Sequence, residues 1–465
     1  MKVEIILIIC INAFSIGVKS QIEQETTDNP QQLSTGADSS QTFFIDNPVQ
    51  LSTGADSSQT FFTEANSVGQ GNAAIFEQQL SAVKTQATGT GTCSGGTYNV
   101  KDFGAKGDGK TDDCKAIQAA WLAACKCTGS PKVLIPSGTY LTGPVQFFGA
   151  CKGTTITLQV QGTLKASTNL GHFGQRDWIC FGWVRGLILT GGGTFDGQGT
   201  ASWPYNKCPV TKKCNVLPTN LKFNAMTDTT VKGITSLNSK FFHIGVVNCQ
   251  KFNVIGVHIT APGDSPNTDG LHFERSSDVT ITDSIIATGD DCISIGHGNS
   301  RMTIKGITCG PGHGISVGSL GRYQNEGDVN GLLVKNCTLS KTTNGVRLKT
   351  WESSPNPSKA INITFEDIIM NNVCNPIIID QTYCPYVSCE SKLPSKVKLQ
   401  DIFFRRIRGT SSTPIAVWLK CNKNIPCQNV VLQDINLSHP AGAKSTCQNI
   451  QAKTLGTVIP TPCKG

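Results

Sequence analysis

A short strand pattern that recurs through the C-terminal half of the chain constrains the fold most. It reads apolar, any, apolar, any, then Gly, Asp or Asn, after which apolar residues resume. It begins at Phe252, Val279, Met302, Leu332, Ile363, Val397 and Val430, at steps of 23 to 34 residues. Period-2 alternation with a polar corner at such intervals predicts an all-β, single-stranded parallel β-helix, in which each coil buries its inward residues on the next. A β-sandwich is the alternative, but its strands usually recur every 8 to 12 residues or so.

One helical pattern precedes the strands. Residues 111–127 place Ile117, Trp121 and Ala124 on one face, and Thr111 is expected to cap the helix N-terminus. A short helix at this position is expected to cover the open end of the solenoid, where it would block edge pairing.

The first 92 residues differ from the rest. Lys2, an apolar run from Ile5 to Val18 and the small residue Ser20 predict a signal peptide over residues 1–20. The run is too short for a membrane span, and no later segment is long and apolar enough, so we expect no transmembrane helix. Residues 21–92 contain an 18-residue tandem repeat rich in Ser, Thr, Gln and Asp. This segment has too little apolar content for a core and is interpreted as disordered linker or propeptide, which leaves 93–465 as the folded domain.

The cysteines agree with export. Of 20 cysteines, Cys10 lies in the predicted signal peptide, and the odd remainder implies at least one free thiol. The close pairs are Cys208/Cys214, Cys384/Cys389 and Cys421/Cys427. Zinc binding is an alternative for these pairs, but no ligand histidine neighbours them, so disulfides are expected. Three glycosylation sequons, at Asn336, Asn362 and Asn436, also fit a secreted protein.

The charge excludes one class of partner. The formal net charge is +8, but no Lys/Arg run resembles a nucleic-acid-binding arm. A dispersed positive surface favours loosely held polyanions, and it is equally compatible with an ordinary solubility charge.

A phosphate-loop pattern between Gly104 and Thr111 is interpreted as a Gly-rich turn before the helix. The segment matches GxxxxGK[ST] and lies between a strand and a helix. However, Asp108 would place a carboxylate beside the phosphates, and an exported chain has no access to nucleotide pools.

Three chemically active residues recur at one spacing. Asp269, Asp291 and His313 are separated by steps of 22 residues. If 22 residues make one coil, the three side chains stack on neighbouring rungs about 4.8 Å apart. Asp290 precedes Asp291, and a bend is needed for both side chains to face one cleft.

Such a cluster can perform acid–base chemistry. Crowded carboxylates raise one another's pKa, so one can stay protonated while another is ionised, which is the equipment for glycosidic bond cleavage. A calcium site and structural turns are the alternatives. His313 lies between two glycines, where the backbone can approach a ligand. Arg347 and Lys349 share one strand face and could form ion pairs with the carboxylates or bind the carboxylate of an acidic sugar.

Four motifs in order resemble those of the polygalacturonases, glycoside hydrolase family 28. They are NTDG at 267–270, GDDC at 289–292, GHG at 312–314 and RLKT at 347–350. The resemblance extends over residues 98–465 and includes the 103–113 segment, GTFDG at 193–197 and Tyr383. Leu348 stands where Ile is usual, and His297 where a small or acidic residue is common. Within the family, GPGHGISVGSLGRY resembles the pollen exopolygalacturonases of plants.

The resemblance implies a right-handed, pectin-lyase-like solenoid and a set of residue roles. Asp290 would protonate the leaving oxygen, Asp269 and Asp291 would activate water, and His313 would orient or tune the acid. The residues expected to bind galacturonate are Arg347, Lys349, Tyr383 and Asn267. The family inverts anomeric configuration, needs no metal or cofactor and hydrolyses α-1,4 links of de-esterified pectin. We therefore expect a monomeric enzyme with a pectin substrate and no nucleic-acid or membrane partner.

Three alternatives stay open at this point. A pectate lyase would share the β-helix but would need calcium and an Arg base. A non-catalytic pectin-binding protein should have lost one of the three aspartates, and all are present. Exo attack is favoured by the subgroup resemblance, but endo attack depends on loop shapes that a sequence does not reveal.

Overall fold

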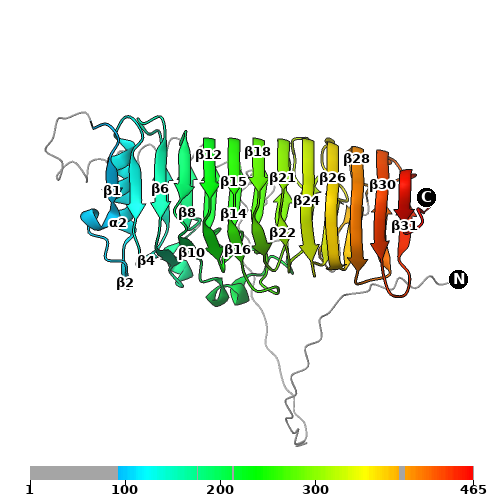
Figure 1. Ribbon diagram of the computed structural model, residues 1–465, viewed down its shortest axis with the longest axis horizontal. Coiled ribbons are helices and arrows are strands. Elements are labelled where there is room, and N and C mark those ends of the chain that lie inside the picture. The colour runs from blue at the N-terminus through cyan, green and yellow to red at the C-terminus, as the bar shows by residue number, and fades with distance from the viewer. Residues whose placement is uncertain (1–92, 175, 212–213, 387–392, 464–465) are drawn as a thin grey trace, which may run out of the picture. The chain divides into compact units, whose positions relative to one another are not determined.

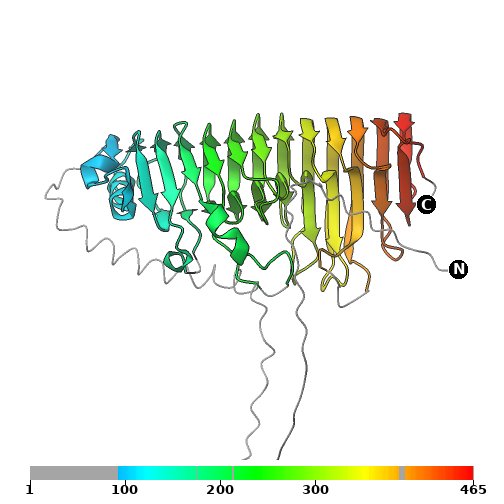
Figure 2. The same cartoon turned by 90° about the horizontal axis from the view of Figure 1, so that it is seen from below.

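The computed structural model describes residues 93–463 except 175, 212–213 and 387–392. The predicted signal peptide and the low-complexity segment lie outside the described residues, so both stay predictions. The described body is a right-handed parallel β-helix, with strands stacked side by side along one axis (Figures 1 and 2). The fold class predicted from the recurring strand pattern is therefore confirmed.

The strands form two parallel sheets, one of 21 strands and one of 11. The larger sheet contains β1 (Thr97–Asn99), β2 (Asp108–Asp112), β3 (Lys132–Ile135), β4 (Thr139–Thr142), β6 (Ile156–Val160), β7 (Thr163–Ala166), β9 (Leu187–Thr190), β10 (Thr194–Asp196), β12 (Thr227–Lys232), β13 (Thr235–Leu237), β15 (Gln250–Ile255), β16 (His258–Thr260), β18 (Ser277–Thr282), β19 (Ile285–Ala287), β21 (Ser300–Lys305), β22 (Thr308–Cys309), β24 (Val329–Ser340), β26 (Ser358–Val373), β28 (Val397–Ser411), β30 (Gln428–Ser438) and β32 (Lys453–Ile459). The smaller sheet contains β5 (Val145–Phe148), β8 (Ile179–Gly182), β11 (Leu221–Asn224), β14 (Ile244–Val247), β17 (Leu271–Glu274), β20 (Ile293–Ile295), β23 (Ile315–Leu320), β25 (Asn344–Trp351), β27 (Asn375–Tyr383), β29 (Ile415–Lys420) and β31 (Lys444–Gln448).

The core runs along the inside of the solenoid as ladders of like residues. Phe147, Phe181 and Phe223 occupy successive coils, with ring centroids 5.0 Å and 4.7 Å apart. Each is fully buried. Burying one such side chain contributes roughly 1.5–3 kcal/mol, so repetition of one apolar position from coil to coil stabilises the whole stack.

The predicted polar corners have left-handed backbone conformations. For the coil that contains β28, however, the predicted register is wrong. Ile363 pairs with Ile402, not with Val397. Asp401 and Arg406 both have positive φ, at 57° and 50°, and Arg406 is the residue that aligns with the corners of the neighbouring coils. Asp401 instead occupies an earlier left-handed position of the same coil. The sequence pattern predicts the corner at Asp401 because Asp adopts positive φ more often than Arg does.

The helix is shorter than predicted and begins differently. It spans α2 (Cys114–Cys125) and covers the N-terminal end of the solenoid in Figure 1, where Trp121 packs on Phe147 at 4.9 Å. Its capping position is Asp113, so the prediction that Thr111 caps it is wrong. Thr111 lies in β2, where its backbone N–H and its hydroxyl both donate to the Asp108 carboxylate.

The Gly-rich turn before α2 uses its backbone N–H groups internally. Lys106 and Gly107 donate to the Asp113 carboxylate at 2.6 Å and 3.0 Å. Lys110 donates to Asp108 at 2.9 Å. A bound phosphate would need these same N–H donors. Their use by Asp108 and Asp113 explains why the turn does not act as a phosphate loop.

Four 3₁₀ turns complete the helical elements of the described chain, namely η1 (Val100–Phe103), η2 (Leu170–His172), η3 (Gly199–Ala201) and η4 (Trp203–Tyr205).

Six disulfides join the described cysteines. They are Cys93–Cys127, Cys125–Cys151, Cys208–Cys214, Cys292–Cys309, Cys421–Cys427 and Cys447–Cys463. Two of the three predicted close pairs are confirmed, and in the third Cys389 lies outside the described residues. Cys114, Cys180, Cys249 and Cys337 are free thiols, so the expectation of at least one free thiol is met.

The sequon residues Asn336, Asn362 and Asn436 are all exposed. No helix in the described ranges has the length and hydropathy to span a membrane.

Candidate active site

The predicted 22-residue register is present in the smaller sheet. The first residues of β17, β20 and β23 pair in register, 22 residues from each to the next. Asp269, Asp291 and His313 each lie two residues before one of these strands, on adjacent coils. The backbone continues the stack, because the Gly270 N–H donates to the Asp291 carbonyl at 2.9 Å. The prediction that these side chains gather in one place is confirmed.

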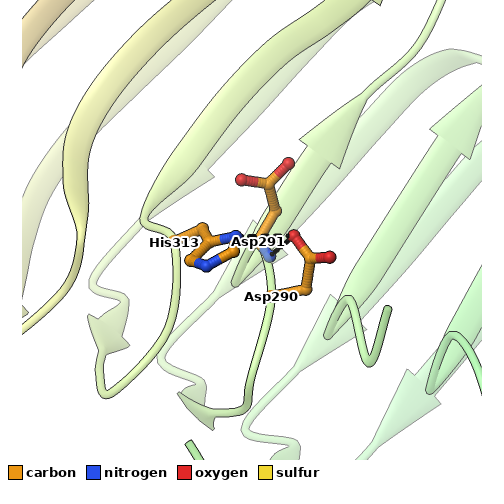
Figure 3. A group of neighbouring side chains, drawn as sticks. All are labelled: Asp290, Asp291 and His313. Atoms are coloured by element: carbon orange, nitrogen blue, oxygen red, sulfur yellow. Dashed lines mark hydrogen bonds and ion pairs between the residues drawn. The ribbon is translucent and has the colours of Figure 1, made fainter. Parts of the chain in front are cut away.

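Asp290 reaches the site because the chain bends before it. Gly289 and Asp290 form the bend, and a Cβ on Gly289 would lie 2.1 Å from the Ser265 carbonyl oxygen, so only glycine fits. The Asp290 carboxylate then faces His313, whose Nδ1 lies 2.9 Å from Oδ1. Figure 3 shows this pair, with the Asp291 carboxylate pointing away from that of Asp290.

Asp291 is enclosed by cations. Lys349 Nζ lies 2.7 Å from one carboxylate oxygen, and Arg347 Nη2 lies 3.5 Å from the other. The Ser316 hydroxyl donates to that second oxygen at 2.7 Å. Both oxygens therefore have charged or hydrogen-bonded partners, so the ion-pair alternative for the two cations is present at Asp291.

Asp269 has a different environment. The Ser294 hydroxyl donates to its Oδ2 at 2.7 Å. Burial raises the pKa of Asp269 well above its usual range, and the negative charges of Asp290 and Asp291 raise that pKa further. Its surroundings therefore favour the protonated form of Asp269.

Asp290 shows the opposite balance. Burial opposes its ionisation, but the hydrogen bond and positive charge of His313, together with Lys349, lower the pKa of Asp290 to about 2. The pKa of His313 is raised: burial works against this, and the hydrogen bond to Asp290 and its charge outweigh burial. In this arrangement one proton lies between His313 and Asp290, mostly on the imidazole.

The predicted binding residues surround these groups. Asn267 donates from Nδ2 to Asp290 at 3.3 Å. The Tyr383 ring centroid lies 5.7 Å from the Arg347 guanidinium carbon and 5.3 Å from Lys349 Nζ. The structure thus brings together all eight residues that the sequence assigned to catalysis and substrate binding.

Four further residues contact the site without having been predicted. Asn206 donates from Nδ2 to the Asn267 side-chain oxygen at 3.1 Å and so orients it. His272, Ser294 and Ser316 form one row on the outer face of the smaller sheet. These three residues recur at the same 22-residue spacing as the aspartates, so the spacing could have located them, whereas Asn206 gave no such signal.

Asp290, Asp291 and His313 also resemble a cation site. One possible ligand atom from each lies within 4.8 Å of the others. However, the Lys349 ammonium already contacts Asp291, and Arg347 adds a second positive charge. A metal ion here would be repelled by both cations, so the donor set suits protonated side chains better than calcium.

Comparisons with known proteins agree on one family. The model of glycosyl hydrolases family 28 matches residues 125–457. The chain belongs to this family. It is 48% identical to an exopolygalacturonase of Platanus acerifolia over 370 residues, which cover 79% of this chain and 97% of that one. An exopolygalacturonase of Zea mays is 46% identical, with 79% and 91% covered. The crystal structure of an exopolygalacturonase from Thermotoga maritima has a TM-score of 0.64 at 18% identity, covering 82% of this chain and 96% of that one, which supports the fold.

Proposed function

We propose that this family 28 chain is a polygalacturonase that hydrolyses α-1,4-galacturonosyl links of de-esterified pectin, acting from the chain end. The observation that carries the proposal is the pairing of Asp290 with His313 beside Asp269 and Asp291, on a coil where Arg347 and Lys349 offer positive charge. Relatives that are 44–48% identical over more than nine tenths of their own length are exopolygalacturonases, which supports exo attack.

Asp290 is proposed as the general acid. With its pKa held at about 2, it can donate a proton only if substrate binding changes its surroundings. A galacturonate carboxylate bound to Lys349 and Arg347 would cancel part of the positive charge that keeps Asp290 ionised. The proton shared with His313 would then move onto Asp290, from which it passes to the leaving glycosidic oxygen.

Asp269 is proposed as the base that activates water. An inverting hydrolase needs about 6.5–9.5 Å between acid and base to admit a water molecule. Asp291 has an oxygen within 4.8 Å of a ligand atom of Asp290, and both its oxygens are engaged by Ser316, Arg347 and Lys349. Asp291 would therefore hold the water, and Asp269 would accept its proton once it has released the proton that burial favours.

Substrate binding is proposed to use Arg347, Lys349 and Tyr383, with Asn267 in support. The Tyr383 ring lies against both cations and offers a flat face to a sugar. Pectin is thus the proposed partner, and a monomer suffices because each named group comes from one chain.

The wider protein is proposed to be secreted to the cell wall. Six disulfides and the plant relatives are consistent with an extracellular enzyme. We propose residues 1–20 as signal peptide, 21–92 as a segment without catalytic residues and 93–465 as the catalytic domain. Asn336, Asn362 and Asn436 are proposed glycosylation sites.

The experiment is a product analysis on polygalacturonate with and without EDTA. We expect galacturonic acid monomer from the earliest time, unaffected by EDTA and without an ultraviolet-absorbing unsaturated product. Unsaturated product would indicate a lyase, and no product would leave only pectin binding. Mixed oligomers would overturn the exo assignment alone.

A further inference from the structure

A chain of hydrogen bonds leads away from Asp269 along the outer face of the smaller sheet. The Ser294 hydroxyl lies 2.7 Å from Asp269 Oδ2 and 2.7 Å from His272 Nδ1. The other ring nitrogen, His272 Nε2, lies 3.2 Å from Glu274 Oε1. Four side chains on two neighbouring coils thus connect the buried carboxylate to Glu274.

The donors and acceptors of this chain can be arranged in two ways that differ only in where one proton lies. In the first, Asp269 is ionised, Ser294 donates to it, and a protonated His272 donates to both Ser294 and Glu274. In the second, Asp269 carries the proton and donates to Ser294, which donates to a neutral His272. Both arrangements satisfy every polar atom of the chain, because a hydroxyl donates and accepts at once.

The two ends of the chain differ in access to water. The Ser294 residue is 2% exposed and Asp269 is 6% exposed. The side chains of His272 and Glu274 are 15% and 19% exposed. The far end of the chain is therefore more exposed to solvent than Asp269.

Charged groups and one aromatic ring surround His272 and its partner Glu274. Glu274 is the acid that faces it, and Arg275 Nη1 lies 3.8 Å from the other Glu274 oxygen. Lys222 and His297 also act on Glu274. The Phe242 ring packs against His272 at an interplanar angle of 31°, with centroids 4.7 Å apart. At the other end of the chain, the negative charges of Asp290 and Asp291 act on Asp269.

The Asp291 carboxylate also accepts a hydrogen bond from a serine, but that serine has a different second partner. Ser316 donates to Asp291 as Ser294 does to Asp269, but Ser316 receives its hydrogen bond from Arg347 Nε at 3.3 Å. A guanidinium keeps its protons in proteins and cannot accept another. Of these two serine-linked carboxylates in the described part of the chain, Asp269 is the one whose serine leads to a group that can accept a proton.

We propose that Ser294, His272 and Glu274 form the route by which Asp269 returns its proton to solvent after each hydrolysis. Resting on the proposed function, the step begins when Asp269 takes a proton from the attacking water as its oxygen bonds to the anomeric carbon. Asp269 passes that proton to Ser294 Oγ, and Ser294 passes its own to His272 Nδ1. The imidazolium releases its Nε2 proton through Glu274 to bulk water, and Ser294 and His272 reset by rotation and proton exchange.

The test compares His272→Ala with Ser294→Ala in the otherwise intact chain on polygalacturonate. We expect each variant to lower kcat at least about 10-fold, less than the 10²–10⁴-fold of a direct acid–base group, with KM within about twofold. Imidazole added to the buffer should restore kcat in His272→Ala, where it can occupy the vacated space beside Ser294. It should not restore Ser294→Ala, in which the route is cut closer to Asp269. His258→Asn, an exposed histidine in β16 of the other sheet, is the control and should retain wild-type values.

Each other outcome contradicts the proposal. A raised KM with unchanged kcat would make His272 a substrate contact, and a lowered kcat that imidazole does not restore would make it a packing residue. If His272→Ala does not fold, Glu274→Gln takes its place, with a lowered kcat that rises with buffer concentration as the expected result and unchanged kcat as the contrary one. An inactive wild-type chain would instead contradict the proposed function.

Discussion

In the proposed mechanism, protonation of Asp290 decides whether the site can cleave a glycosidic bond. The sequence located Asp290, Asp269 and Asp291 but could not say which carboxylate holds a proton. That distribution depends on which oxygen faces His313, Ser294 or Lys349, and spacing along the chain carries no such information. Burial and the charges of Asp290 and Asp291 raise the pKa of Asp269. At Asp290 burial acts in the same direction, but the hydrogen bond and charge of His313, 2.9 Å away, outweigh it and lower the pKa.

Removing the acid should abolish most turnover. We expect Asp290→Asn to fold and to lower kcat by at least about 10²-fold, the usual contribution of a general acid. Circular dichroism checks the fold and a reducing-sugar assay measures kcat. Near wild-type turnover would remove Asp290 from the mechanism.

Arg347 should matter more for charged than for neutral substrates. Arg347→Ala should remove a charged hydrogen bond to the substrate carboxylate. The kcat/KM on polygalacturonate should therefore fall by a factor that corresponds to about 1.5–3 kcal/mol of lost transition-state stabilisation. Arg347 also contacts Asp291, so part of the loss will appear on methyl-esterified oligomers as well. The ratio of the two losses is the informative quantity, with Arg301→Ala, whose ion pair with Asp278 lies on the other sheet, as control. Equal losses on both substrates would limit Arg347 to supporting Asp291.

The His313–Asp290 ion pair should make stability depend on pH. The pKa of His313 is raised above 6.5, so its contribution is complete below 6.5 and is lost as pH rises through the raised value. The pKa of Asp290 is lowered from 3.8 to about 2, so its contribution is present above 3.8 and is lost as pH falls toward 2. His313→Gln should therefore reduce the free energy of unfolding by about 1 kcal/mol between these limits, discounted because His313 is 39% exposed. Denaturant titrations at several pH values measure the difference, which should shrink in alkaline buffer, and a constant difference would contradict the ion pair.

At the scale of elements, the sequence predicted the coils well where each corner residue resembles the next. The register of β17, β20 and β23 followed from the 22-residue spacing alone. The register prediction is wrong at β28, where Arg406 occupies the polar corner and Asp401, five residues earlier, matches the sequence pattern of a corner. The sequence prediction failed also at α2, because Asp108 hydrogen-bonds Thr111 and keeps it in a strand. Asp108 and Thr111 are three residues apart, so these hydrogen bonds form a local turn that competes with the helix at its N-terminal end.

The bend that presents Asp290 should depend on Gly289. Gly289→Ala would place a Cβ 2.1 Å from the Ser265 carbonyl oxygen and 2.5 Å from its nitrogen. The backbone must shift, so we expect a lower melting temperature and a loss of kcat larger than the loss of stability alone explains. Gly143→Ala, where nothing lies within 4 Å of the added Cβ, is the matched control and should behave as wild type. Thermal melts and kinetics on both variants provide the comparison, and normal activity in Gly289→Ala would show that the bend tolerates a side chain.

At the scale of the whole molecule, a solenoid turns a spacing in the sequence into a row in space. Equivalent positions of successive coils lie about 4.8 Å apart, so a residue type repeated at one coil length builds a continuous surface. The aspartates form such a row, and His272, Ser294 and Ser316 form another beside it. Family membership, the register and the cation pair beside Asp291 together support a site for cleaving an acidic polysaccharide.

The most direct test of this account is NMR spectroscopy of the first products formed from polygalacturonate. In the proposed mechanism, water activated by Asp269 attacks the anomeric carbon on the face opposite the leaving oxygen that Asp290 protonates. Early spectra should therefore show β-galacturonic acid, mostly as monomer, before mutarotation produces the α form. First-formed α product would contradict the assignment of Asp290 and Asp269 as an inverting acid and base.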